Sequence, residues 1–125
     1  MPTLYGVFRS RASRPIWLLY ELGEAFDHVP VIQAYRLAQA SAPDAPLNTT
    51  SASFLTVNPQ GQVPAYVEGD LVLTESLSIT NHIARTRGGP LGAQTPAEQA
   101  LIDQWTLLAV TAVETPALEI LNVQG

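Results

Sequence analysis

The chain has 125 residues, a formal net charge of −5 and a hydrophobic content of 46%, values that fit one ordinary globular domain and exclude an intrinsically disordered chain. The excess of acidic residues argues against nucleic acid or an anionic membrane surface as a partner. Cysteine is absent, which excludes disulfides, thiolate metal sites and Cys-x-x-Cys redox chemistry.

The first third of the chain predicts a strand, a helix and a second strand. Residues 3–8 are rich in β-formers, and residues 27–32 predict a second strand whose Pro30 favours an edge position or a strand end. The apolar run 16–22 between them predicts a buried helix. Its boundary signals are Ser13 as N-cap, Pro15 in the first turn and Gly23 after the last apolar residue. A helix between two strands favours a right-handed parallel β-α-β unit.

A long irregular segment follows this unit. Residues 33–53 are rich in Ala, Pro, Ser, Asn and Thr and show weak periodicity. Segments of this length without regular structure often carry function. Residues 54–57 predict a short helix or turn before the dipeptide Asn58-Pro59.

A hairpin and a helix are predicted next. Residues 63–67 and 71–74 have the composition of strands, and Glu68-Gly69-Asp70 joins them as a turn. Residues 75–87 predict a helix, with Arg85 and Arg87 near its C-terminus, where the helix dipole favours positive charge.

The last segment predicts the beginning of a helical region. Thr95-Pro96-Ala97-Glu98 has the pattern of a capping box with proline at the first helical position. The helix should run to about Glu114 and be broken or kinked by Pro116. We therefore predict an α/β fold, in which a thioredoxin-like βαβ-ββα domain precedes the start of an all-helical domain. The expected boundaries are 1–87 for the first domain, 88–94 for a linker and 95–125 for the partial helical domain.

Two features of residues 58–79 concern chemistry rather than packing. Pro64 stands at the mouth of a strand, beside backbone that could be open to a ligand. Glu75 and Ser76 begin a helix, where free N–H groups and the helix dipole favour an anion. The residues alone leave plain alternatives open, namely an ordinary trans proline at a strand start and a simple N-cap.

Three motifs then stand in a recognisable order. They are Phe8-Arg9-Ser10, Asn58-Pro59-x-Gly61-x-Val63-Pro64, and Leu73-x-Glu75-Ser76-Leu77-x-Ile79. Together they resemble the cytosolic glutathione transferases of a zeta/theta-like bacterial type, and the Phe-Arg-Ser turn with Gln62-Val63-Pro64 is most similar to the zeta class (maleylacetoacetate isomerase-like). The resemblance covers about residues 1–87 and fades into the first helix of the C-terminal domain. It implies a transferase in detoxification with glutathione as co-substrate and a homodimeric assembly.

The resemblance implies a role for each residue of the last two motifs. Pro64 would follow a cis peptide bond, which leaves the N–H and C=O of Val63 facing outward to pair with the cysteinyl unit of glutathione. Gln62 would belong to the same binding segment. At the γ-glutamyl end, Ser76 would bind the α-carboxylate and Glu75 the α-amino group.

Ser10 is the catalytic candidate that the resemblance implies. It lies between the first strand and the first helix, so its hydroxyl could donate to the glutathione sulfur and favour the thiolate, without a general base. Ser13 is the alternative. Tyr5 lies within the strand and is expected in the core. Where the zeta-type motif carries Ser-Cys after its first serine, this chain has Arg11-Ala12, which departs from zeta-type isomerase chemistry; Arg9 and Arg11 would instead add positive potential near the thiolate.

The remaining polar residues carry weaker signals. Arg36 could reach the glycyl carboxylate of glutathione or be an ordinary surface arginine. His28 and His82 have no partner at metal-ligand spacing, so no metal site is expected. Residues near the start of the last helix could face the site or the second substrate, although a core tryptophan among solvated polar residues is the plainer expectation: Asp103, Gln104 and Trp105.

Two functions follow from these residues. The first is a glutathione transferase that attacks a small electrophile, and the second is a non-catalytic glutathione-binding or protein-interaction module. The family's helical domain is larger than the fragment present here, so the last helix must bury its apolar face elsewhere, and self-association is expected. No signal peptide precedes the first strand, and no apolar run approaches the roughly 20 residues of a membrane span. A cytoplasmic protein without nucleic-acid or membrane partners is therefore expected.

Overall fold

A computed structural model describes residues 1–124. Gly125, which the expected helical domain 95–125 includes, lies outside the described residues. The chain forms two compact units, Met1–Gly89 and Pro90–Gly125, and each is described by itself.

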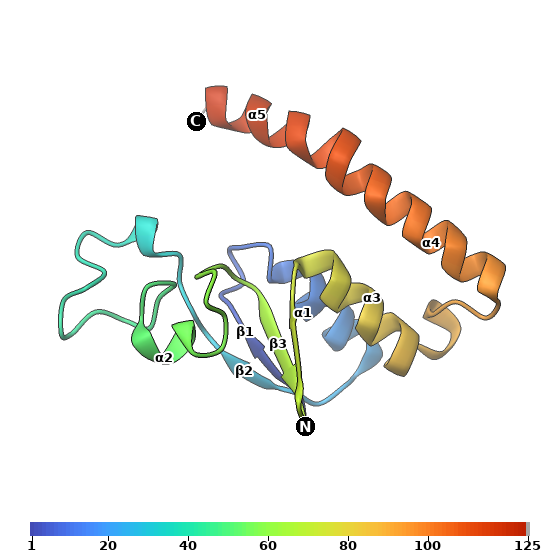
Figure 1. Ribbon diagram of the computed structural model, residues 1–125, viewed down its shortest axis with the longest axis horizontal. Helices are drawn as coiled ribbons and strands as arrows, with labels where there is room; N and C mark the ends of the chain where they lie inside the picture. Colours follow the sequence, from blue (N-terminus) through green and yellow to red (C-terminus); the bar gives the residue numbers. More distant parts are fainter. Residues whose placement is uncertain (125) are drawn as a thin grey trace. The chain divides into compact units, whose positions relative to one another are not determined.

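The first unit is built on a four-stranded mixed sheet (Figure 1). Its strands are β1 (Thr3–Tyr5), β2 (Asp27–Val29), β3 (Ala65–Glu68) and β4 (Leu71–Thr74), in the order β2-β1-β3-β4. β1 is parallel to β2 and antiparallel to β3, and β3 is antiparallel to β4. This pairing, with its helices, confirms the predicted α/β, thioredoxin-like fold.

The first two strands are shorter than predicted. Gly6 leaves the extended conformation at φ 141°, although its N–H still donates to Val29 C=O and the next N–H, that of Val7, donates to Val31 C=O. Pro30 has no N–H and cannot continue the ladder. The strands therefore end in a loop that remains hydrogen-bonded to its neighbour.

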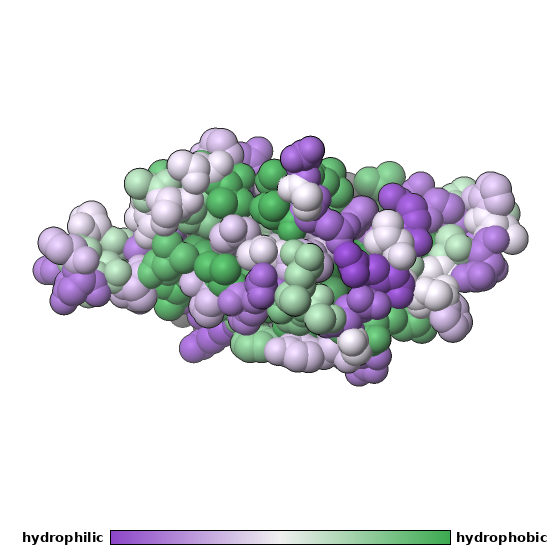
Figure 2. Space-filling model, turned by 90° about the horizontal axis from the view of Figure 1, so that it is seen from below, coloured by the Kyte–Doolittle hydropathy of each residue, from purple (hydrophilic) through white to green (hydrophobic). Residues whose placement is uncertain are grey.

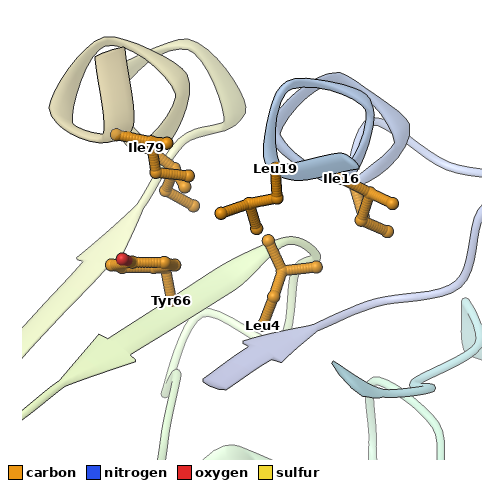
Figure 3. Close-up of a cluster of buried hydrophobic side chains, with 7 residues drawn as sticks. Leu4, Ile16, Leu19, Tyr66 and Ile79 are labelled. Carbon is orange, nitrogen blue, oxygen red and sulfur yellow. The ribbon is translucent and has the colours of Figure 1, made fainter. Parts of the chain in front are cut away.

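Helices α1 (Ser13–Leu22) and α3 (Ser76–Arg87) cover one face of the sheet. Figure 3 shows Leu4 and Tyr66 projecting from the strands toward Leu19 and Ile79 on the two helices. Each is fully buried. Burial stabilises the fold by about 1.5–3 kcal/mol for each large apolar side chain, so this cluster holds both helices against the sheet.

The opposite face carries the short helix α2 (Ala52–Leu55) and the 3-10 turn η1 (Ala34–Arg36). Phe54 packs there against Val31 and Ala65. The long segment between β2 and α2 is held by the buried Asn48, whose side-chain amide donates to the carbonyls of Ala40 and Pro46. The irregular stretch is therefore fixed from within by one buried amide.

A polar network joins three elements at the C-terminal end of α3. Arg87 Nη1 donates to Glu24 Oε2 at 3.1 Å, and Arg87 Nη2 donates to Glu68 Oε2. Tyr66 donates to the same carboxylate oxygen at 3.0 Å, and His82 Nε2 lies 3.4 Å from the other. The network ties the end of β3 to the ends of α1 and α3.

This network gives the folded state a defined pH dependence. The hydrogen bond from Arg87 lowers the pKa of Glu68, against the opposing effect of burial, and burial together with Glu68 raises the pKa of Tyr66 to about 12. A lowered folded-state pKa means that the Glu68 contribution is present above its ordinary pKa of 4.5 and is lost as pH falls through the folded value. The Tyr66 contribution is present below pH 10 and is lost as pH rises toward 12.

Urea unfolding between pH 7 and pH 3 tests the acid limb. We expect the free energy of unfolding to fall in acid and the Glu68→Gln variant to show a shallower fall over the same range, because it has no carboxylate to protonate. Parallel curves for the two proteins would assign the acid sensitivity to other groups.

The second unit is one long helical run. After the 3-10 turn η2 (Gly89–Leu91), helix α4 (Pro96–Leu108) begins with half of the predicted capping box: Glu98 N–H donates to Thr95 Oγ1 at 3.1 Å. The Glu98 carboxylate accepts from Gln94 N–H and not from Thr95 N–H, as a full capping box requires. Proline occupies the first helical position.

The predicted end of this helix near Glu114, with a break at Pro116, is wrong, while the alternative of a kink at Pro116 stays a prediction. A π-helical stretch η3 (Ala109–Glu114) leads directly into α5 (Thr115–Gln124). Pro116 cannot donate to the preceding turn, and the wider π turn before it accommodates the proline without ending the helix. Thr115 Oγ1 caps a carbonyl of this turn, that of Val110, at 3.3 Å.

The long helix exposes many apolar side chains. They include Leu101, Trp105, Leu108, Val113, Ile120 and Leu121. The run Pro96–Val123 is long and apolar enough to cross a membrane by length and composition. This corrects the expectation that no segment approaches such a span, although core helices of soluble proteins meet the same criterion.

Figure 2 shows hydrophobic patches separated by hydrophilic residues on the face of the molecule that it displays.

Candidate functional site

The site begins where β1 gives way to the loop before α1. A Cβ added at Gly6 would lie 2.7 Å from Ala12 Cβ, 3.4 Å from Val63 Cβ and 3.7 Å from Pro64 Cα. Only glycine is compatible with both this spacing and the φ of 141°. Gly6 therefore allows the start of α1 to approach the segment that enters β3.

Ser10 holds the turn at the start of α1. Its Oγ donates to Val7 C=O at 2.6 Å and accepts from Ala12 N–H at 3.0 Å. The prediction that Ser13 caps this helix is wrong: the cap position is Ala12, and the nearby hydroxyl that accepts a backbone N–H is that of Ser10. Ser13 is an exposed first residue of the helix, whose N–H donates to Ser10 C=O.

The segment before β3 is fixed by a buried asparagine. Asn58 is 2% exposed; its amide donates to Gln62 C=O at 2.8 Å and its Oδ1 accepts from Gln60 N–H at 3.1 Å. The Val63–Pro64 peptide bond is cis. Within residues 1–124 no hydrogen bond engages the N–H or C=O of Val63, which is half-buried.

The start of α3 contributes the third part of the site. Glu75 is exposed and has φ 70°, an uncommon conformation for a residue other than glycine. Ser76 is only 5% exposed, and its Oγ accepts from Arg14 Nη1 at 3.0 Å. A guanidinium can only donate, so the hydroxyl proton of Ser76 is left for another acceptor. Positive charge, free helix N–H groups and a donor hydroxyl therefore meet at one point.

Sequence reasoning missed three residues that position these parts. Gly6 and Arg14 are described above. Gln33 Nε2 donates to Arg9 C=O at 3.1 Å, which ties the loop carrying Ser10 to the start of η1. A glycine inside the β-rich run 3–8 was a signal for Gly6. Nothing in the sequence pairs Arg14 with Ser76, because 62 residues separate them.

The weaker candidates lie elsewhere. The Arg36 guanidinium lies 5.8 Å from the centre of the Tyr35 ring, and His82 belongs to the Glu68 network. His28 Nε2 lies 2.5 Å from Gly6 C=O and its ring packs against Phe8. In the second unit, Asp103 accepts from Gln99, and Trp105, expected in the core, is 59% exposed. Among residues 1–124 no three His, Asp or Glu side chains gather as a metal site requires.

Comparisons with known proteins show the family to which the chain belongs. Residues 4–91 match the family model described as "Glutathione S-transferase, N-terminal domain". The chain is 47% identical over 55 residues to a glutathione S-transferase of Hyoscyamus muticus, a stretch that covers 42% of this chain and 26% of that protein. It is 27% identical over 120 residues to glutathione S-transferase F9 of Arabidopsis thaliana, covering 94% and 51%.

Solved structures show the same likeness. A theta-class glutathione S-transferase from Xanthomonas axonopodis pv. citri, with glutathione bound, superposes with a TM-score of 0.72 at 28% identity, covering 89% of this chain and 49% of that one. Glutathione transferase F7 from Populus trichocarpa gives 0.67 at 32% identity, covering 89% and 49%. The chain thus spans about half the length of the relatives that align with nearly all of it. The similarity to the zeta class stays a prediction.

Proposed function

The chain belongs to the glutathione S-transferase family, and from that premise we propose that it binds glutathione and activates its thiol for attack on a small electrophile. The observation that carries the proposal is the convergence of Ser76, the Arg14 guanidinium and the free N–H groups of α3 at one helix start. A carboxylate placed there would accept charge-assisted hydrogen bonds from several donors at once.

Glutathione would lie between α3 and the Val63 segment. Its γ-glutamyl carboxylate would accept from Ser76, and its amino group would pair with the exposed carboxylate of Glu75. The cysteinyl unit would pair with the backbone of Val63, whose N–H and C=O have no partner within residues 1–124, next to Gln62. Pro64, which follows a cis bond, would be the structural cis-proline of this segment.

Ser10 would supply the hydrogen bond that stabilises the thiolate, with Ser13 as the alternative. In the structure its proton is directed to Val7 C=O, while its oxygen accepts from Ala12. Rotation of the hydroxyl about the Cβ–Oγ bond would redirect the proton to the glutathione sulfur and keep the oxygen near Ala12 N–H. A thiol pKa lowered from about 8.5 toward neutrality creates the nucleophile.

Glutathione binding tests the proposal directly. We expect calorimetry to detect binding to the 125-residue chain and Ser76→Ala to weaken it about ten- to a hundredfold, because a hydrogen bond to a charged group is worth about 1.5–3 kcal/mol. Ser78→Ala is the matched control, since Ser78 is an exposed serine on the same helix. An unmodified chain that does not bind glutathione would overturn the proposal.

A second function remains open to the same chain: a glutathione-binding or protein-interaction module without turnover. The chain spans about half the length of the relatives that align with nearly all of it. If the electrophile pocket of those relatives depends on their other half, turnover would require residues outside the matched half. Retention of glutathione together with no conjugation of an aryl halide would favour the module. Conjugation above the uncatalysed rate would favour the transferase.

We also propose that the protein is a cytoplasmic homodimer that acts in detoxification. The apolar side chains exposed along α4 and α5 support self-association, because a helix with such a surface gains free energy by burying it. A monomer in sedimentation at micromolar concentration would contradict the dimer.

A further inference from the structure

His28 lies beside the loop that carries Ser10 and takes no part in the chemistry proposed above. It is the half-buried middle residue of the edge strand β2, where the register pairs it with Leu4 of β1. Residues paired in register share one face of a sheet, and Leu4 projects toward α1 (Figure 3). The His28 side chain therefore lies on the face of the sheet that α1 covers.

The imidazole holds the peptide unit between Gly6 and Val7. His28 Nε2 lies 2.5 Å from Gly6 C=O. A carbonyl oxygen can only accept a hydrogen bond, so Nε2 carries the proton of the neutral ring. The N–H of the same peptide unit, that of Val7, donates to Val31 C=O at 3.2 Å. Both polar groups of this peptide are therefore held by β2 and the residues that follow it.

The same ring contacts the residue after Val7. Its centre lies 5.3 Å from the centre of the Phe8 ring, and the two rings meet edge to face. Phe8 stacks on Tyr20 at 6.4 Å, and Tyr20 meets Phe26 at 5.6 Å. Phe26 lies 6.2 Å from His28, which closes a cycle of four rings. Aromatic pairs attract one another at such separations, so the cycle holds the Phe8 side chain although it is largely exposed.

His28 thus contacts the residues on both sides of Val7. The Val7 carbonyl accepts the Ser10 hydroxyl at 2.6 Å, so the place of this carbonyl sets where the Ser10 oxygen lies. A donor acts on a reacting atom only when it is held close to the productive geometry, and a misplacement of about 1 Å can cost a reaction about a hundredfold. The contacts of His28 therefore bear on the group proposed to stabilise the thiolate.

We propose that His28 is a positioning residue for thiolate formation. Its two contacts fix the Val7 carbonyl and, through it, the Ser10 hydroxyl. The inference rests on the proposed function and adds a residue that acts through others without touching glutathione. Its effect appears in the thiol pKa of bound glutathione and not in glutathione affinity, which depends on the segments at the starts of β3 and α3.

Two substitutions separate the contacts of the ring. His28→Phe keeps a ring beside Phe8 and removes the donor to Gly6 C=O, whereas His28→Gln keeps an N–H donor and removes the ring. We expect His28→Phe to raise the thiol pKa of bound glutathione by about 0.5–1 unit, measured by ultraviolet titration, and to change the affinity for glutathione less than about twofold. His28→Gln should recover about half of the pKa shift or more, because the donor is restored.

His82→Phe is the matched control. His82 is the other histidine of the chain, and its ring meets Tyr66 edge to face at 5.8 Å, so phenylalanine keeps a ring contact here as well. Its Nε2 faces Glu68 in the network at the C-terminal end of α3. This substitution should leave the thiol pKa unchanged, and an equal shift in His28→Phe and His82→Phe would overturn the inference.

The unaltered chain offers a second measurement, which needs no variant to fold. Nitrogen-15 NMR of the imidazoles should place the proton of the neutral His28 ring on Nε2, and a proton on Nδ1 would overturn the inference.

The remaining outcomes separate the inference from the proposed function. An unchanged thiol pKa in His28→Phe, while Ser10→Ala raises it, would overturn the role of His28 alone. A loss of glutathione affinity as large as the loss of thiolate would show that His28 is purely structural. Failure of the unaltered chain to bind glutathione would overturn the proposed function and the inference with it.

Discussion

Ser10→Ala should raise the thiol pKa of bound glutathione by about one to two units and lower turnover near pH 7 about ten- to a hundredfold. The hydroxyl is the donor proposed for the sulfur, and a hydrogen bond to the charged form favours that form. Without it, less of the bound glutathione is thiolate at neutral pH. Ultraviolet titration of the complex measures the thiolate directly.

The same substitution should have a modest structural cost. Ser10 Oγ satisfies Val7 C=O and Ala12 N–H, so its loss should lower the free energy of unfolding by about 1 kcal/mol. Glutathione affinity depends on the Val63 and Ser76 segments in this proposal. A large change in thiol pKa with a small change in binding would therefore identify a catalytic rather than a purely structural role.

Two variants complete this test. Ser10→Thr keeps a hydroxyl at the position and should keep most of the thiolate, whereas Ser13→Ala removes an exposed hydroxyl three residues away. If Ser13→Ala raises the thiol pKa and Ser10→Ala does not, the catalytic assignment moves to Ser13. If neither does, backbone N–H groups at the start of α1 stabilise the thiolate instead.

Gly6→Ala is expected to have the largest effect on stability, a loss of about 3–5 kcal/mol in the free energy of unfolding. The new methyl group would lie 2.7 Å from Ala12 Cβ, a separation too short for two non-bonded carbon atoms. The φ of 141° would also be strained for alanine. Relief of the clash would displace the loop from Val63 and Pro64. Denaturant unfolding measures the loss, and glutathione affinity should fall with it.

Gly23→Ala is the matched control for this prediction. Gly23 also has a positive φ, 66°, at the C-terminus of α1, but a Cβ there would meet no atom within 4 Å. Only the left-handed conformation is penalised, by about 1 kcal/mol. Equal losses in the two variants would show that close packing at Gly6 contributes nothing beyond its backbone conformation.

Local signals in the sequence were sufficient to predict most helices and strands of the first unit. Gly23 ends α1, and the order of strands and helices predicts the sheet, because each element was marked by residues within a few positions of it. The start of α1 shows where such signals fail. Ser10 and Ser13 are both suitable capping residues, and the path of the loop, not residue preference, decided that the hydroxyl of Ser10 accepts the Ala12 N–H.

The prediction of where the last helix ends was wrong for a similar reason. Pro116 is a strong local signal for a break, yet the helix continues through a π turn to Gln124. One missing N–H costs one hydrogen bond, and a wider turn avoids the steric clash that normally ends a helix at proline. Such a compensation depends on the backbone geometry of several residues together, and the identity of no single residue predicts it.

The sequence by itself determined the family likeness, the order of the elements and the segments at which glutathione is proposed to bind, because those motifs are contiguous. Only the tertiary structure decided how the segments meet. Arg14 reaches Ser76 across 62 residues, Gly6 lies against Ala12 and Pro64, and Arg87 joins Glu24 to Glu68. These contacts depend on the packing of α1 and α3 on one sheet, and local sequence preference has no information about partners so distant along the chain.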